Sequence, residues 1–152
     1  MLAGAALRAH APQLEVMTAG TMSIDGLPMS WRTRAGFDAV GLTRPTHRSR
    51  QVTAQDLERA TLVIALAPEH VEWVRREHPR AADRTATLKR LVRDLPAGER
   101  SLSDRLADLH LAGADLGHWE EVVDPGGGEV EAFTACAHEV VALIEALAPR
   151  LS

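Results

Sequence analysis

The sequence predicts a three-layer α/β fold in which a short parallel sheet is flanked by helices. Segments of strand and helix character alternate along the chain, as they do where helices connect parallel strands. Residues 61–66 form a continuous apolar run of strand length, the pattern of a strand covered on both faces. Residues 130–147 carry their apolar side chains on one helical stripe. A chain of 152 residues suits one core, so we expect a single domain over residues 1–152.

The first part of the chain is expected to fold as helix, strand and helix. Residues 2–10 have a good helix composition that ends before Pro12. Residues 14–17 alternate apolar with polar side chains and lead into a turn, which predicts a strand. Pro28 is expected to open a second helix that runs to about Val40 and ends at Gly41.

The middle of the chain contains clear helix start and stop signals. Thr53 and Asp56 have the spacing of a capping box and predict a short helix. Pro68 is expected to open the next helix, which Pro79 ends. Glu72 and Arg76 are placed to support that helix as an i,i+4 ion pair.

Two further helices and a short strand are expected before the last helix. The apolar residues of 88–95 recur at helical spacing, and residues 85–88 can supply a short strand first. Ser101 or Ser103 can cap the following helix, with Gly113 near its end.

Composition excludes several classes of partner. The net charge is −4, with 17 basic residues scattered among 21 acidic ones, so nothing suggests a nucleic-acid partner or an anionic membrane surface. No apolar run approaches the ~18 residues of a membrane span. The single cysteine, Cys136, excludes an intrachain disulfide and a cysteine-rich zinc site, and His110 and His118 lack metal-ligand spacing. We expect a cytoplasmic protein without a metal.

Four segments, taken together and in order, carry a family resemblance. They are Thr18-Ala-Gly-Thr21, Gly26-Leu-Pro28, His47-Arg-Ser-Arg-Gln-Val-Thr53 and Val123-Asp-Pro125. In this order they resemble the low-molecular-weight protein tyrosine phosphatases. The resemblance implies a phosphotyrosine-protein-phosphatase-I-like fold and hydrolysis of phosphotyrosine or other phosphomonoesters through a cysteinyl-phosphate intermediate. It implies no cofactor, and a phosphorylated protein or a small phosphomonoester as substrate wherever the family's phosphate loop is present.

The Cys-x5-Arg phosphate loop of that family has no counterpart in these residues. Cys136 is followed by Ala-His-Glu-Val-Val-Ala, without an arginine six positions on, and it lies on the apolar side of the last predicted helix. By resemblance, the central first strand of the sheet is also missing. We therefore expect the 152 residues alone to be inactive, and we expect Met1 to be internal to a longer reading frame. The alternative is a non-catalytic relative that binds a partner, or a homodimer formed by strand exchange.

The resemblance also assigns the candidate site residues. Asp124 would be the general acid that protonates the leaving oxygen, although an Asp-Pro pair before glycines is also strong turn chemistry. His47, Arg48 and Arg50 could face a phosphate or could be ordinary solvated loop residues. Glycines 126–128 stand where the family has aromatic residues that form a wall for the substrate, so phosphotyrosine need not be favoured.

Overall fold

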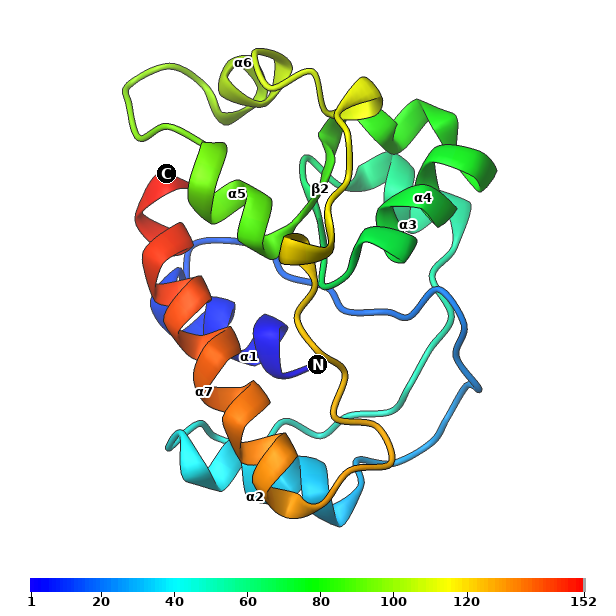
Figure 1. The fold of residues 1–152 in the computed structure, drawn as a ribbon, viewed down its shortest axis with the longest axis vertical. Coiled ribbons are helices and arrows are strands. Elements are labelled where there is room, and N and C mark those ends of the chain that lie inside the picture. The colour runs from blue at the N-terminus through cyan, green and yellow to red at the C-terminus, as the bar shows by residue number, and fades with distance from the viewer. Residues whose placement is uncertain (152) are drawn as a thin grey trace. The chain divides into compact units, whose positions relative to one another are not determined.

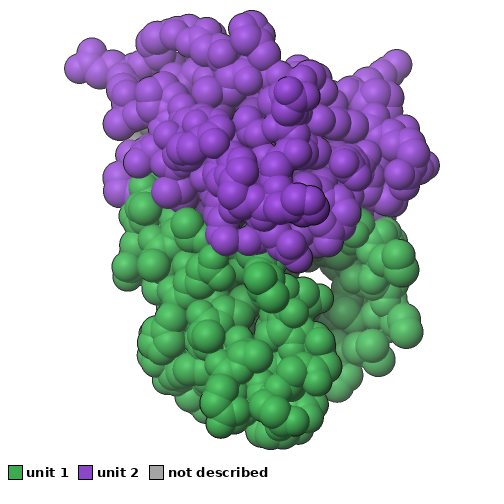
Figure 2. All heavy atoms as spheres, in the orientation of Figure 1, with its two compact units in different colours: residues 1–51, 122–148 green, residues 52–121, 149–152 purple. Residues whose placement is uncertain are grey.

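The computed structural model describes residues 1–151. Their contacts divide into two compact units, which Figure 2 shows in different colours. Unit 1 contains residues 1–51 and 122–148, and unit 2 contains residues 52–121 together with the residues from 149 onward. The expectation of a single domain stays a prediction.

Unit 1 is built on three helices, α1 (Leu2–His10), α2 (Trp31–Ala39) and α7 (Val130–Leu147). The long α7 packs against both α1 and α2 (Figure 1). The helices predicted over residues 2–10 and 130–147 are thus confirmed. The buried apolar side chains of this unit are Ala6, Leu7, Ala11, Phe37, Val122, Ala137, Val140, Ile144, Leu147 and Ala148.

Gly36 allows α2 to approach α7 closely. A Cβ atom at this position would lie 3.1 Å from the carbonyl oxygen of Phe133 and 3.4 Å from the Cβ of Ala137. The first of these distances is shorter than ordinary van der Waals contact with a backbone atom, which cannot easily move. The packing of α2 on α7 therefore depends on a residue without a side chain.

The strand predicted at residues 14–17 does not form. The segment joins no ladder in the described part of the chain, and the nearest pairing along the chain is an isolated parallel bridge between Gly20 and Gln51. The carbonyl of Val16 instead accepts a hydrogen bond from Nη2 of Arg8 at 2.6 Å. Alternating polarity describes a segment that can be extended, whereas a strand also requires a partner in register.

The second helix begins later than predicted. Ser30 is its N-cap and accepts the N–H of Thr33 at 3.1 Å, so the helix starts at Trp31. Pro28 lies before it in an isolated antiparallel bridge with Arg48. The predicted end is confirmed, since Gly41 has the positive φ of 66° that favours glycine after a helix.

Unit 2 contains the parallel sheet, which consists of β1 (Val63–Ala65) and β2 (Thr85–Thr87). Val63 pairs with Thr85 and Ala65 pairs with Thr87. The strand expected within residues 61–66 and the short strand expected near Thr85 are both confirmed. The neighbouring helices of this unit are α3 (Ala54–Arg59), α4 (Pro68–Glu77), η1 (Pro79–Arg84) and α5 (Leu88–Asp94).

The helix signals of the middle segment act largely as predicted. Both hydrogen bonds of the capping box join Thr53 and Asp56, at 3.2 and 2.9 Å, and α4 opens with Pro68. One expected contact is different, because Arg76 pairs with its neighbour Glu77 at 2.7 Å instead of with Glu72.

The helix capped by Ser101 is shorter than predicted. This helix, α6, covers Leu102–Ala107, and His110, three residues after its end, adopts a left-handed conformation with a φ of 48°. Residues up to Gly113 continue as the 3-10 turn η2 (Leu111–Gly113). The other turns of this type are η3 (His118–Glu120) and η4 (Ala148–Arg150). Over residues 1–151, none of the helices has both the length and the apolar character needed to cross a bilayer.

Candidate active site

Asp124, the predicted general acid, lies in an exposed turn before α7. Its Oδ1 accepts the N–H of Gly126 at 2.9 Å, and the N–H of Gly128 closes the turn on the carbonyl of Pro125 at 2.8 Å. The positive φ of 79° at Gly127 makes this turn possible without strain. Asp124 therefore has the turn role that its sequence context suggests, and its role as an acid stays a prediction.

Cys136 is not prepared for nucleophilic attack. Its side chain is half-buried on α7, and burial raises the pKa of its thiol. The negative charges of Glu139 and Asp124 raise this pKa further. A nucleophilic cysteine needs positive charge or N–H groups around it to stabilise the thiolate. The environment of Cys136 does the opposite.

His47 lies half-buried near positive charge. Burial lowers the pKa of its imidazole, and the charge of the Arg8 guanidinium lowers it further. The ring is therefore held in the neutral form near pH 7. Arg8 was missed at the sequence level, where it is only one polar residue of a helix, and only the folded chain shows its effect on His47.

Arg48 and Arg50 are directed toward the loop that precedes α2. The guanidinium of Arg48 donates to the carbonyl of Gly26 at 3.2 Å, and that of Arg50 contacts Sδ of Met17. Within residues 1–151, no hydrogen bond or ion pair joins His47 or Arg48 to Asp124. The predicted phosphate-facing residues thus come from one segment, but the structure does not show them converging on the predicted acid.

The loop that precedes α2 is also held by Ser49, which lies between the two arginines, and by Gln51, which follows Arg50. Ser49 Oγ accepts the N–H of Leu27 at 2.9 Å. The Gln51 amide accepts the N–H of Ser23 and donates to the carbonyl of Thr21, both at 2.8 Å. Both residues belong to the segment His47–Thr53 that carries the family resemblance, which was the available signal for them.

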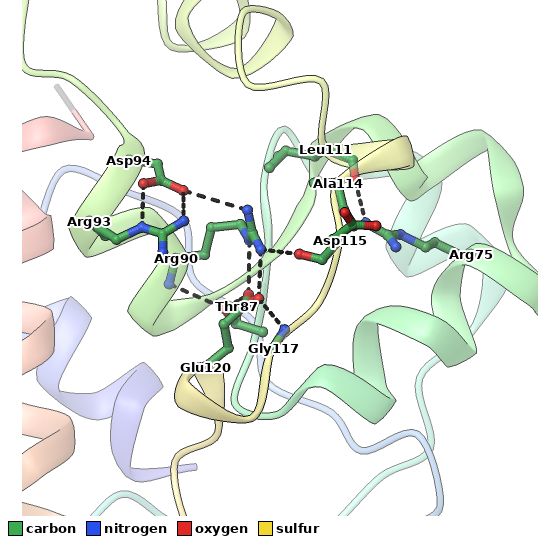
Figure 3. A network of polar contacts seen from close by, with 10 residues as sticks. All are labelled: Arg75, Thr87, Arg90, Arg93, Asp94, Leu111, Ala114, Asp115, Gly117 and Glu120. Carbon is green, nitrogen blue, oxygen red and sulfur yellow. Dashed lines mark hydrogen bonds and ion pairs between the residues drawn. The ribbon is translucent and has the colours of Figure 1, made fainter.

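A buried ionic network lies in unit 2 (Figure 3). The side chain of Glu120 is 0% exposed and is surrounded by donors. Thr87 Oγ1 donates to it at 2.7 Å, the N–H of Gly117 at 2.9 Å, and Nε and Nη2 of Arg90 at 2.9 and 2.6 Å. Burial alone would raise the pKa of this carboxyl, but the hydrogen bonds from Arg90, Thr87 and Gly117 outweigh it and lower the pKa to about 2.

The outer part of this network reaches the surface. Arg90 also faces Asp94 at 3.6 Å, and Arg93 donates to Asp94 at 2.6 Å. The Arg93 guanidinium lies 3.9 Å from the centre of the Trp119 ring, within cation–π distance. With its carboxylate fully paired, Glu120 fixes η3 to β2 and α5 and is not available as a proton donor. Among the described residues, no group of acidic, histidine and cysteine side chains is arranged to hold a metal ion.

Comparisons with known proteins agree with the resemblance. The model of the family described as low molecular weight phosphotyrosine protein phosphatase matches residues 1–108. The chain belongs to this family. This chain is also 28% identical, over 140 residues, to a protein-arginine-phosphatase of Geobacillus stearothermophilus. The alignment covers 92% of this chain and 78% of the relative.

Solved structures of phosphatases have the same fold as this chain. The YwlE arginine phosphatase from Geobacillus stearothermophilus matches with a TM-score of 0.75 at 27% identity, over 97% of this chain and 80% of its own. The tyrosine phosphatase Wzb from Escherichia coli K30, solved with sulphate, matches with a TM-score of 0.76 at 18% identity, over 99% and 88% of the two chains. The α/β class and the parallel sheet flanked by helices, both predicted from sequence, are confirmed.

Proposed function

We propose that residues 1–152 supply the scaffold and the acid of a hydrolase that removes phosphate from phosphorylated side chains, but cannot form a cysteinyl-phosphate by themselves. The proposal rests on the environment of Cys136, the only thiol in these residues, whose pKa is raised by burial and by two carboxylates. Attack on phosphorus requires a thiolate, together with N–H groups and an arginine that stabilise the phosphate. Cys136 has neither the ionisation state nor the following arginine.

We assign the substrate class to phosphorylated protein side chains, with phosphoarginine preferred to phosphotyrosine. Two observations support this choice. The relative that is 28% identical is a protein-arginine-phosphatase, and glycines replace the aromatic residues that resemblance would place after the Asp-Pro pair. In either reaction Asp124 would give its proton to the leaving atom, which is oxygen for phosphotyrosine and nitrogen for phosphoarginine.

Phosphate release tests the proposal. Purified residues 1–152 should release no phosphate above a protein-free blank from p-nitrophenyl phosphate, a phosphotyrosine peptide or a phosphoarginine peptide. A fusion that places a strand and a Cys-x5-Arg loop before Met1 should be active, with the phosphoarginine peptide as its best substrate. Asp124→Asn in that fusion should lower the rate by about 10²- to 10⁴-fold, the usual contribution of a general acid. Turnover by residues 1–152 that Asp124→Asn abolishes would refute the proposal.

A second function is supported by the segment around Val16. In the described part of the chain, residues 14–17 join no ladder, and we infer that a strand of another molecule pairs with them, replacing the hydrogen bond that the Val16 carbonyl accepts from Arg8. Strand exchange between two copies would give a homodimer. Light scattering should then show a dimer whose population rises with concentration, and Val16→Pro should remove it. A monomer at every concentration would exclude this function.

A further inference from the structure

Unit 2 contains an open cleft of about 580 Å³, here termed the Asp83 cleft. Sites for small molecules commonly measure roughly 300–1,000 Å³ and have apolar walls with a few polar groups. The Asp83 cleft has the same character. Its walls are formed by Asp83 near the end of η1, by Ala107 at the end of α6 and by residues 109–114, of which only His110 is polar.

His110 stands in the wall of the cleft in an uncommon backbone conformation. Within residues 1–151, it is the only residue other than glycine with a positive φ, and its φ is 48°. A side chain disfavours this conformation, and residues held in it are often found at functional sites. His110 is exposed, and its imidazole can donate or accept a hydrogen bond. The chain thus places a polar group at the cleft where a glycine would fit the backbone more easily.

The wall around η2 is held in place by Arg75 of α4 (Figure 3). Nη2 of Arg75 donates to the carbonyl of Leu111 at 2.5 Å and to that of Ala114 at 2.8 Å. The N–H of Gly113 adds a hydrogen bond to the carbonyl of His110 at 3.1 Å. The wall is therefore ordered before any ligand arrives, which lowers the entropy cost of binding.

Asp83 gives the cleft a negative charge, since it is the only acidic residue in the walls and no arginine or lysine is among them. Its side chain is 75% exposed, and its Oδ1 lies 3.6 Å from Nη1 of Arg84, too far for a direct hydrogen bond. The Arg84 guanidinium is directed instead to two carbonyls, those of Arg80 at 2.8 Å and Leu57 at 3.1 Å. The carboxylate of Asp83 therefore retains acceptor sites for a second cation.

We propose that the Asp83 cleft binds a small amine that has an apolar body. The ammonium group pairs with the Asp83 carboxylate and donates to the His110 imidazole, and the apolar body covers the leucine and alanine side chains of the wall. Asp83 would repel an anion of the same size, and a purely polar cation would leave the apolar wall in water. The site goes beyond the proposed hydrolase, because its walls include neither Asp124 nor Cys136.

A nuclear magnetic resonance titration of isotope-labelled residues 1–152 with phenethylamine at constant pH tests the site. Phenethylamine should bind saturably, with the largest shift changes at the amides of residues 109–114. Phenethyl alcohol lacks the charge and ethylamine lacks the ring, so each should bind at least about tenfold more weakly. Hydrocinnamate carries the opposite charge and should not bind. Absence of saturable phenethylamine binding, equal binding of phenethyl alcohol, or shift changes confined to other residues would overturn the proposal.

Two pairs of variants locate the binding. A Cβ atom at Gly113 would meet no atom within 4 Å, so Gly113→Val should fill the cleft without disturbing the fold and weaken phenethylamine binding by about tenfold or more. Gly98→Val, at a glycine with equally open surroundings, is the control and should change nothing. Asp83→Asn should weaken binding by about tenfold, whereas Glu99→Gln, at an exposed carboxylate outside the cleft, should not. Unchanged binding by Gly113→Val and Asp83→Asn would place the ligand elsewhere and overturn the proposal.

His110→Gly separates a role in binding from a role in folding. Glycine adopts a positive φ without steric cost, so the thermal midpoint should change little. Loss of the imidazole should still weaken phenethylamine binding by about three- to tenfold. Unchanged affinity in this variant would contradict the proposed contact between the ammonium group and His110. The amide spectra of all variants report directly whether each one is folded.

Discussion

Replacing Glu120 by glutamine should destabilise the protein strongly, because it removes a buried charge on which four hydrogen bonds converge. The structure lowers the pKa of this carboxyl from 4.5 to about 2. Each pKa unit corresponds to 1.36 kcal/mol, so the charged form contributes about 3 kcal/mol to folding at neutral pH. Breaking a buried ion pair on one side also costs roughly 3–5 kcal/mol, since Arg90 would be left without its carboxylate.

Urea unfolding at pH 7, followed by tryptophan fluorescence, measures this effect. We expect Glu120→Gln to lower the free energy of unfolding by about 3 kcal/mol, a large part of the roughly 5–15 kcal/mol that stabilises a typical domain. Arg100→Gln is the control, because it breaks an ion pair with Asp108 in which both side chains are exposed, and it should leave the unfolding free energy nearly unchanged. A loss below about 1 kcal/mol for Glu120→Gln would refute the reasoning.

The same network predicts a difference in acid stability. A carboxyl whose pKa is lowered on folding stabilises the protein fully above its unfolded pKa, and this contribution is lost as pH falls through the folded pKa. For Glu120 the window lies between pH 4.5 and about pH 2. Wild-type protein should lose more stability across that window than Glu120→Gln. If the unfolding free energies of the two proteins fell equally with pH, Glu120 would not be held ionised by its neighbours.

Three further predictions concern unit 1. Gly36→Ala should lower the unfolding free energy by about 1–3 kcal/mol in thermal melts, because its Cβ would press on the carbonyl of Phe133; unchanged stability would mean that the two helices can separate. Iodoacetamide should alkylate Cys136 more slowly than glutathione at pH 8, since its pKa is raised, and an equal or faster rate would contradict the buried, carboxylate-lined environment. The NMR titration of His47 should give a pKa below the ordinary value, and Arg8→Gln should raise it; no change in that variant would remove Arg8 as a cause.

The sequence predicted correctly those helices and strands that are determined by interactions between residues close together in the chain. The apolar run of residues 61–66, the capping box at Thr53 and the amphipathic pattern of residues 130–147 each fix an element through neighbouring residues. The wrong expectations involve distant contacts. Residues 14–17 alternate correctly but find no strand beside them, and Pro28 pairs with Arg48 instead of opening a helix.

The candidate site was only partly visible in the sequence. Asp124 and His47 were identified through a family resemblance, which assigns roles by position and says nothing of their surroundings. The carboxylates near Cys136 and the cation near His47 appear only when the chain is folded. Glu120 gave no signal, because its partners Thr87 and Arg90 lie about thirty residues earlier and nothing local marks the pairing.

The proposal that residues 1–152 contain no thiolate nucleophile is tested most directly at Cys136 itself. Residues 1–152 are incubated with p-nitrophenyl phosphate and with a phosphoarginine peptide, quenched rapidly, and examined by intact-protein and peptide mass spectrometry for a phosphate adduct. We predict that Cys136 stays unmodified, since burial and the charges of Glu139 and Asp124 keep its thiol protonated. A phosphorylated Cys136 that forms and decays at the rate of phosphate release would contradict the account.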